Sequence, residues 1–218
     1  MSGETQQHDG GAKTARRCPK GEAGLAPRTT PGKPVLKDSA RHMKSYLPRS
    51  WISPKLVPGQ SKIHGVGVIA SESIRAGERL MEFGGEIISP ADFETDVYRM
   101  RSIWQVGEGV YLALREDDPE PSLDENLNHS CDANSWLADE VTLVARRDIE
   151  AGEEITLDQG TWNFDEDEYV WDQDQCSCGA EHCRKTLTQD DWKRPDVRER
   201  YRDHFHPYLR RLMENTRS

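Results

Sequence analysis

Four of the five cysteines in this 218-residue chain have a spacing that suits a metal ion. Cys176, Cys178 and Cys183 lie in one C-x-C-x4-C segment, in which Gly179 permits a sharp turn. A structural zinc site takes four ligands in a tetrahedron, and thiolates are common among them. In a reducing compartment, clustered cysteines favour a metal over disulfides. The segment therefore predicts a Zn²⁺ site that lacks only its fourth ligand.

Two residues are candidates for that fourth ligand. His182 lies inside the loop, but it is the direct neighbour of Cys183, and adjacent residues bind one zinc ion only with awkward geometry. Cys131 is distant in the sequence and has no such restriction. We predict Cys131 and keep His182 as the alternative. A Cys131 ligand would tie the C-terminal segment to the middle of the chain.

Short runs of β-forming residues, separated by glycine turns, lie before and after Cys131 in the sequence. The runs expected to form strands are residues 66–70, 79–83, 86–88, 110–114 and 141–145. The turn Ile-Arg-Ala-Gly-Glu at 74–78 returns loosely as Ile-Glu-Ala-Gly-Glu at 149–153. Apolar residues at helical spacing predict a helix within 90–105. The pattern as a whole indicates a mostly β protein.

The two ends of the chain differ from this central part. Residues 1–45 are polar, have no hydrophobic period and are expected to be disordered, so that Cys18 has no role there. Residues 46–170 are expected to form the main domain, and residues 171–190 the zinc-binding segment. Residues 191–218 are expected to form an amphipathic helix that Pro207 interrupts.

The net charge of −10 is divided unevenly along the chain. Residues 1–50 carry ten basic and four acidic residues, which gives them +6 and leaves −16 on the remainder. An acidic body repels nucleic-acid phosphates and attracts basic proteins, although a solvated surface without a partner explains the same charge. The sequence has neither the roughly 20 apolar residues of a membrane span nor the apolar core of a signal peptide. We expect a soluble intracellular protein, cytoplasmic or nuclear, with no membrane attachment and no direct nucleic-acid binding; the oligomeric state is left open.

Several segments, in order along the chain, resemble the SET-domain protein-lysine methyltransferases that carry a post-SET zinc segment. Residues 127–134, Leu-Asn-His-Ser-Cys-Asp-Ala-Asn, resemble the family signature N-H-S-C-x-P-N, with Ala133 in place of the proline. The other matching segments are 63–68 (an opening G-x-G element), 82–86 (E-Y-x-G-E), 144–158 (A-x-R-x-I-x-x-G-E-E-L-x-x-D) and the cysteine loop. Together they cover about residues 56–190.

The resemblance implies a SET-domain fold of small antiparallel sheets with knot-like C-terminal threading, followed by a helical tail. It also implies S-adenosyl-L-methionine and Zn²⁺ as cofactors and protein-lysine N-methyltransferase activity on a basic protein or peptide. The cofactor-binding residues that it implies are His64, Gly65, Val66, Gly67, Tyr111, Asn128, His129 and Leu187. The metal ligands are Cys131, Cys176, Cys178 and Cys183.

The chain departs from the family at three positions that should line the channel for the target lysine. Phe83 replaces the tyrosine of E-Y-x-G-E, whereas Leu157 and Gln159 replace the two aromatics of a Y-D-Y run. Gln159 stands where the family places its catalytic tyrosine. We expect these three to be the channel positions, with Trp162 or Tyr169 completing the wall.

Two other functions are compatible with parts of this pattern. The missing tyrosines suggest a catalytically weak module that serves as a cofactor-binding or protein-interaction scaffold. The cysteine loop alone would also suit a zinc ribbon that binds nucleic acid. Residues 170–190, however, mix four acidic residues with Arg184 and Lys185 and do not give the basic surface that such a ribbon needs.

Overall fold

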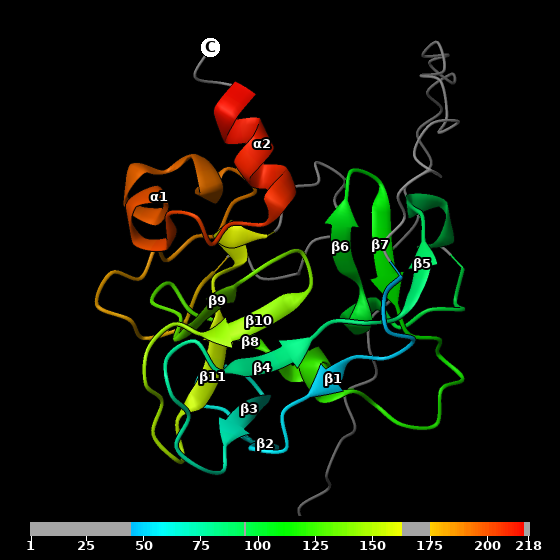
Figure 1. Ribbon diagram of the computed structural model, residues 1–218, viewed down its shortest axis with the longest axis horizontal. Coiled ribbons are helices and arrows are strands. Elements are labelled where there is room, and N and C mark those ends of the chain that lie inside the picture. Colours follow the sequence, from blue (N-terminus) through cyan, green and yellow to red (C-terminus); the bar gives the residue numbers. More distant parts are fainter. Residues whose placement is uncertain (1–44, 94, 163–174, 216–218) are drawn as a thin grey trace, which may run out of the picture. The chain divides into compact units, whose positions relative to one another are not determined.

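Three small sheets organise the part of the protein that the computed structural model describes, residues 45–93, 95–162 and 175–215 (Figure 1). The first sheet has the order β1 (Trp51–Ile52), β4 (Arg79–Glu82), β10 (Thr142–Ala145), β9 (Ser135–Leu137). The second has the order β2 (Leu56–Gln60), β3 (Val66–Ala70), β11 (Glu154–Leu157), β8 (Asn128–His129). The third has the order β5 (Glu86–Ile88), β7 (Val110–Ala113), β6 (Trp104–Gly107). All pairings are antiparallel except that of β8 with β11, which is parallel.

The main hydrophobic core is built from residues of the first two sheets, together with Trp104 and Leu112 of the third. In β3, Val68 and Ala70 are buried whereas Val66 is exposed. Leu80, Met81 and the other buried residues of the cluster add to this core, whose burial from water is the principal stabilising contribution. The five predicted strands are present, and the prediction of a mostly β chain is confirmed.

The two similar turn segments lie against each other as a matched pair. Ile74 and Ile149 form an isolated antiparallel bridge, with N–H to O distances of 2.8 Å in both directions. Three residues after each isoleucine comes a glycine with positive φ, 80° at Gly77 and 90° at Gly152. Each turn also bonds to the strand that precedes the other turn. The Gly77 N–H donates to Ala145 O at the end of β10, and the Gly152 N–H donates to Ala70 O at the end of β3. The repeated motif therefore closes the first two sheets onto each other.

The prediction of a helix within 90–105 is wrong. The described residues of the segment, 90–93 and 95–105, form two short 3₁₀ turns, η2 (Pro90–Asp92) and η3 (Met100–Ser102), and then enter β6. Its backbone is instead bonded to the chain that follows β7, where Arg99 N–H donates to Leu114 O and Glu116 N–H to Val97 O. The apolar side chains that suggested one helical face therefore point to different surroundings.

Two helices follow the cysteine segment, α1 (Pro195–Tyr201) and α2 (Pro207–Asn215), drawn in orange and red in Figure 1. Helix α1 ends at Arg202, which has a positive φ of 44°. Together with η6 (Asp191–Lys193), the helices build a second hydrophobic cluster around Tyr201 and Phe205. Ala133 belongs to this cluster, and Trp136 of β9 packs against it. The C-terminal helices are thus packed onto the segment that carries Cys131.

Candidate metal centre and cofactor site

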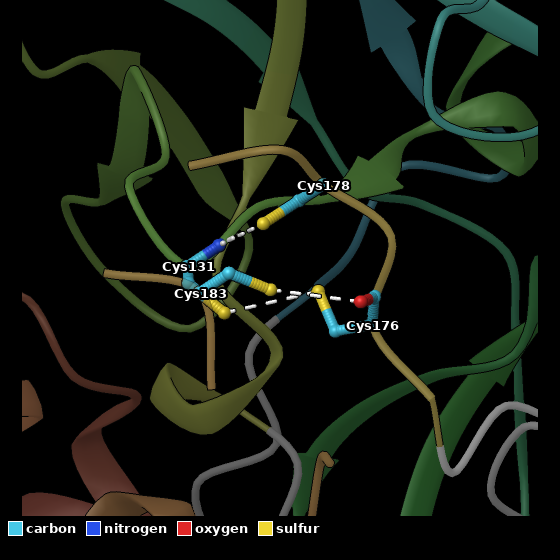
Figure 2. A group of neighbouring side chains, drawn as sticks. All are labelled: Cys131, Cys176, Cys178 and Cys183. Atoms are coloured by element: carbon cyan, nitrogen blue, oxygen red, sulfur yellow. Dashed lines mark hydrogen bonds between the residues drawn. The ribbon is translucent and has the colours of Figure 1, made fainter. Parts of the chain in front are cut away.

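The structure brings the four predicted cysteines together. Their sulfur atoms all lie within 4.8 Å of one another, and Figure 2 shows the Cys131 side chain meeting the three thiols of the loop. Cys131 Sγ and Cys176 Sγ are 3.8 Å apart, which is about the separation of two thiolates on a tetrahedral zinc with Zn–S bonds of about 2.3 Å. His182 is exposed and is not a member of the group. Within the residues that the structure describes, no second cluster of this kind occurs.

The protonation of these thiols also suits a metal. Burial raises the pKa of Cys131 to about 11 and raises that of Cys176 as well. Burial would also raise the pKa of Cys178, but the N–H groups of Cys131 and Ala180 and the neighbouring thiols lower it to about 7. Four packed thiols cannot all ionise without a cation, so a divalent ion would displace their protons. The donor set therefore fits Zn²⁺.

One imidazole connects the cysteine group to the channel position Gln159. The Gln159 N–H donates to His129 Nδ1 at 3.0 Å, so the ring proton is on Nε2. His129 Nε2 lies 3.3 Å from Cys131 Sγ and is therefore the donor of that contact. Burial lowers the pKa of His129 to about 4, which keeps the ring neutral at physiological pH. Both ring nitrogens are thus occupied within the protein, and what His129 can offer a cofactor is its backbone.

A buried arginine forms the second connection between the cysteine loop and the end of β11. The Arg184 guanidinium donates two hydrogen bonds to Asp158, of 2.8 Å and 2.6 Å. Its Nε also lies 2.7 Å from Asp191 Oδ2, an electrostatic contact rather than a well-aligned hydrogen bond. The three side chains are at most 4% exposed. Although burial opposes the charge, the bonds to Asp158 hold the pKa of Arg184 above its ordinary value. The Arg184 N–H also donates to Cys131 Sγ at 3.3 Å.

The candidate cofactor residues of the β2–β3 turn lie beside Asn128. The Asn128 amide donates to His64 O at 3.1 Å, to Val66 O at 3.3 Å and to Glu154 Oε1 at 2.8 Å. Gly65 has a φ of +53°, and no atom lies within 4 Å of where a Cβ would stand. The turn is thus open to a ligand on this side, because glycine lets a ligand approach the backbone closely.

Gly67 leaves space for the Glu154 carboxylate. A Cβ at this position would lie 2.4 Å from Glu154 Oε1. Glu154 also accepts from the Ser61 hydroxyl at 2.8 Å, so this one carboxylate fixes both the turn and Asn128. Glu154 is a site residue that sequence reasoning missed, since nothing in the G-E-E run indicates which glutamate points to the turn.

The other two predicted cofactor residues lie elsewhere. Tyr111 is buried in the third sheet, where its ring meets Phe93 edge-on and its hydroxyl accepts from Gln105 at 3.3 Å. Leu187 is half-buried and follows the Gln175–Thr186 bridge. The described contacts bring together the 64–67 turn, Asn128 and His129, and the cofactor roles of Tyr111 and Leu187 stay predictions.

Two of the three channel positions, Phe83 and Leu157, belong to the main core, whereas Gln159 is half-buried. Phe83 and Leu157 are both 3% exposed. Phe83 stacks on Trp104 with ring centroids 3.7 Å apart, and Trp104 stacks on Trp162 at 4.5 Å. We refer to Phe83, Trp104 and Trp162 as the aromatic stack. Sequence reasoning named Trp162 as a candidate wall residue but missed Trp104, and Tyr169 lies outside the described residues.

The contacts of Trp104 also define its polar edge. Its indole N–H donates to Glu140 O at 2.8 Å, so this group is not available to a ligand. The stack therefore offers ring faces and no hydroxyl group, unlike the tyrosines that the family resemblance led us to expect.

Comparison with known families agrees with this arrangement. Residues 65–160 match the family model described as SET domain. These residues are a SET domain. The fold prediction is thereby confirmed, and the cysteine loop that follows the SET domain is consistent with a post-SET zinc segment.

Curated relatives of the SET domain include the rice histone-lysine N-methyltransferase TRX1, 34% identical over 146 residues, which are 60% of this chain and 13% of that protein. Histone-lysine N-methyltransferase ASHH3 of Arabidopsis thaliana is 30% identical over 139 residues, 59% of this chain and 37% of that protein. The chain therefore spans much less than two thirds of these relatives. A crystal structure of Arabidopsis thaliana SUVH6 in complex with SAM is similar at 21% identity, with a TM-score of 0.46, over 61% of this chain and 32% of that one. Within the described part of the chain, neither α1 nor α2 has the length and apolar composition of a membrane span.

Proposed function

We propose that the protein is an S-adenosylmethionine-dependent protein-lysine N-methyltransferase that acts on a basic protein of the histone class. The observation that carries the proposal is the convergence of three motif segments on one place. Asn128 binds the backbone of the 64–67 turn, His129 binds Gln159, and Cys131 meets the cysteine loop. The names of the SET-domain relatives support a lysine substrate.

The methyl donor would bind at the 64–67 turn, next to β8, where no atom lies within 4 Å of the position of a Cβ on Gly65. Carbonyl groups and N–H groups of the turn and the backbone of His129 are the groups that would bind it, since the side chains of Asn128 and His129 are engaged within the protein. Bound S-adenosylmethionine would supply the methyl group from its sulfonium. The Zn²⁺ would be held by the four cysteines and would have a structural role.

Methyl transfer to lysine needs a neutral amine and an in-line approach. The free amine has a pKa near about 10.4, and an apolar channel favours its neutral form. In the transfer, the lysine nitrogen forms the new C–N bond as the S–C bond breaks, so accurate placement contributes most of the acceleration. Phe83, Leu157 and Gln159, together with Trp162, are the residues of this chain that would surround that amine.

The acidic body of the protein supports a basic substrate. Residues 51–218 carry a charge of −16, and opposite charge accelerates the encounter of two proteins. Zinc-segment residues 171–190 and the tail beyond them would then be parts of the same catalytic unit rather than a separate nucleic-acid-binding module.

The deciding experiment incubates the full chain with methyl-labelled S-adenosylmethionine and a mixture of core histones or basic peptides, and separately measures cofactor affinity by calorimetry. We expect labelled lysine and saturable cofactor binding. Asn128→Ala should abolish both, because it releases the 64–67 turn. Asn126→Ala, which removes an amide at the end of η4 (Leu123–Asn126), is the matched control and should retain both. Cofactor binding without any labelled lysine would contradict the proposed activity.

A further inference from the structure

Helix α1 makes two hydrogen bonds to the segment that carries Cys131. The Ala133 N–H donates to the Tyr201 hydroxyl at 3.2 Å, and Arg200 Nη1 donates to Cys131 O at 2.6 Å. Both partners in the first bond are buried, with Tyr201 at 0% and Ala133 at 1% exposure. The last residues of α1 thus fix two backbone groups on either side of Asp132.

Arg146 also holds the same segment. Its guanidinium donates to Ala133 O and to Asp132 Oδ1, both at 2.9 Å, and it lies over the Tyr201 ring at 5.4 Å. The position of Cys131 therefore depends on contacts from α1 and from the residue that follows β10. None of these three side chains is a metal ligand.

The identity of residue 133 is matched to Tyr201. Ala133 stands where the resembling signature has proline, and proline has no N–H to donate. A proline ring would place its Cδ in the position of the Ala133 hydrogen and so against the Tyr201 hydroxyl. Conversely, a buried N–H without an acceptor is unfavourable, and Ala133 needs Tyr201 for that reason.

We propose that Tyr201 is a positioning residue for the metal centre: through the Ala133 N–H it holds the 130–134 segment so that Cys131 meets the other three thiols. Ala133 and Tyr201 act as one matched pair, and the C-terminal helices are required for retention of the metal. The cofactor site depends on the pair as well, because Cys131 Sγ receives the His129 ring that positions Gln159. This last step rests on the proposed function, whereas the metal retention does not.

The test is a double-mutant cycle with Tyr201→Phe, Ala133→Pro and the combined variant. Each full-length protein is loaded with Zn²⁺, and the rate of metal transfer to a chromophoric chelator is measured. Tyr201→Phe leaves the Ala133 N–H without its acceptor and should accelerate release by about ten-fold. Ala133→Pro alone should accelerate it by a similar factor of about ten, because the ring meets the hydroxyl.

The combined variant distinguishes positioning from general loss of stability. It has neither the unpaired N–H nor the hydroxyl that the proline ring would meet, so its release should be slower than that of either single variant, although the contact of the Tyr201 hydroxyl with Asp158 is lost as in Tyr201→Phe. A rate in the combined variant as high as the product of the two single effects would overturn the proposal, as would a Tyr201→Phe rate equal to that of the wild type. If Tyr201→Phe does not fold, Arg200→Gln decides, because loss of its bond to Cys131 O should also accelerate release and an unchanged rate would refute the role of α1.

Tyr98→Phe is the matched control, since it removes a hydroxyl bonded to Glu86 at 2.9 Å, outside the metal centre. Its metal release should equal that of the wild type. Cofactor affinity and transfer of label, measured on the same proteins, separate this inference from the proposed function. If metal release follows the predicted cycle but no lysine is labelled, only the proposed methyltransferase activity is refuted. If lysine is labelled but the wild type and the three variants release metal at the same rate, only the role of the Ala133–Tyr201 pair is refuted.

Discussion

The two sides of Gln159 are stabilised in different ways. On one side, the cysteine group, His129 and the Arg184–Asp158 pair reach residues 158–159 through directional contacts: an N–H to imidazole bond and a two-point ion pair. On the other side, the aromatic stack packs ring on ring, with interplanar angles of 11° and 27°. We call these the polar side and the aromatic side.

The difference explains where the chain keeps the family pattern and where it departs from it. A directional contact requires one donor and one acceptor at one distance, so a change of either partner leaves a buried group unsatisfied. A stack requires volume and a flat surface, and another aromatic residue can supply both. The polar side keeps the Asn-His-Ser-Cys run and the cysteine loop of the resembling motifs, whereas the aromatic side has Phe83 where a tyrosine was expected and stacks it with Trp104 and Trp162.

The largest effect on stability should come from removing the buried cation of the polar side. Arg184→Met would leave the buried carboxylates of Asp158 and Asp191 without their cation, and we expect a loss of about 3–5 kcal/mol in the free energy of unfolding. Urea denaturation measures this. Arg194→Met breaks an exposed pair with Asp196 and should change stability by less than about 0.5 kcal/mol. Equal losses in the two variants would show that burial of the Arg184 charge is not decisive.

Lowering the pH should weaken metal binding on the polar side. In the metal-free protein, burial raises the pKa of both Cys131, to about 11, and Cys176. Both thiols therefore hold their protons between pH 6 and 8, and zinc must displace one from each. Zinc affinity should fall by at least about 100-fold for each pH unit of acidification in this range. Competition with a zinc indicator measures it, and a constant affinity would mean that these cysteines are not the ligands.

Removing one ring from the aromatic stack should destabilise the protein without increasing the rate of zinc release. Trp104→Leu removes both stacking contacts of a 5% exposed ring and leaves Glu140 O without its donor. We expect a loss of about 2–4 kcal/mol in the free energy of unfolding. The rate of zinc transfer to a chelator at low denaturant should be unchanged, because the contacts of the polar side remain. Faster metal release in this variant would mean that the two sides are not independent.

The smallest effect on stability is expected at Gln159, where the two sides meet. Gln159→Tyr restores the family phenol on a half-buried residue, and the backbone bond to His129 does not depend on the side chain. Stability should change by less than about 1 kcal/mol, whereas transfer of labelled methyl groups should become faster because a hydroxyl can orient the amine. Thermal unfolding and the labelling assay are the two measurements. An unchanged transfer rate would indicate that the aromatic stack has replaced the phenol in function.

Features set by local spacing could be predicted from the sequence. The strands follow from glycine turns and apolar runs, and both Gly77 and Gly152 do have the positive φ that such turns need. The cysteine loop follows from the distances between its three thiols along the chain. The choice of Cys131 over His182 rested on one geometric argument about neighbouring residues.

Features that depend on contacts between distant residues were not predicted. Nothing near Arg184 shows that it will bind Asp158 and Asp191, and the hydroxyl of Tyr201 meets Ala133 only because α1 packs there. The error at 90–105 has the same origin. A spacing of apolar residues predicts a common face, but Trp104 joins the main core while Met100 stays exposed.

The paired isoleucine turns determine where this domain can accept additional sequence. The bridge between Ile74 and Ile149 closes a loop of about 75 residues, and doubling the length of a loop costs only about 0.6 kcal/mol in closure entropy. The third sheet and the 90–103 segment lie inside that loop. Extra residues inserted there would therefore add little to the entropic cost of closing the loop, and the pairing of Ile74 with Ile149 would be kept. Members of the family can be expected to differ most in length within this interval.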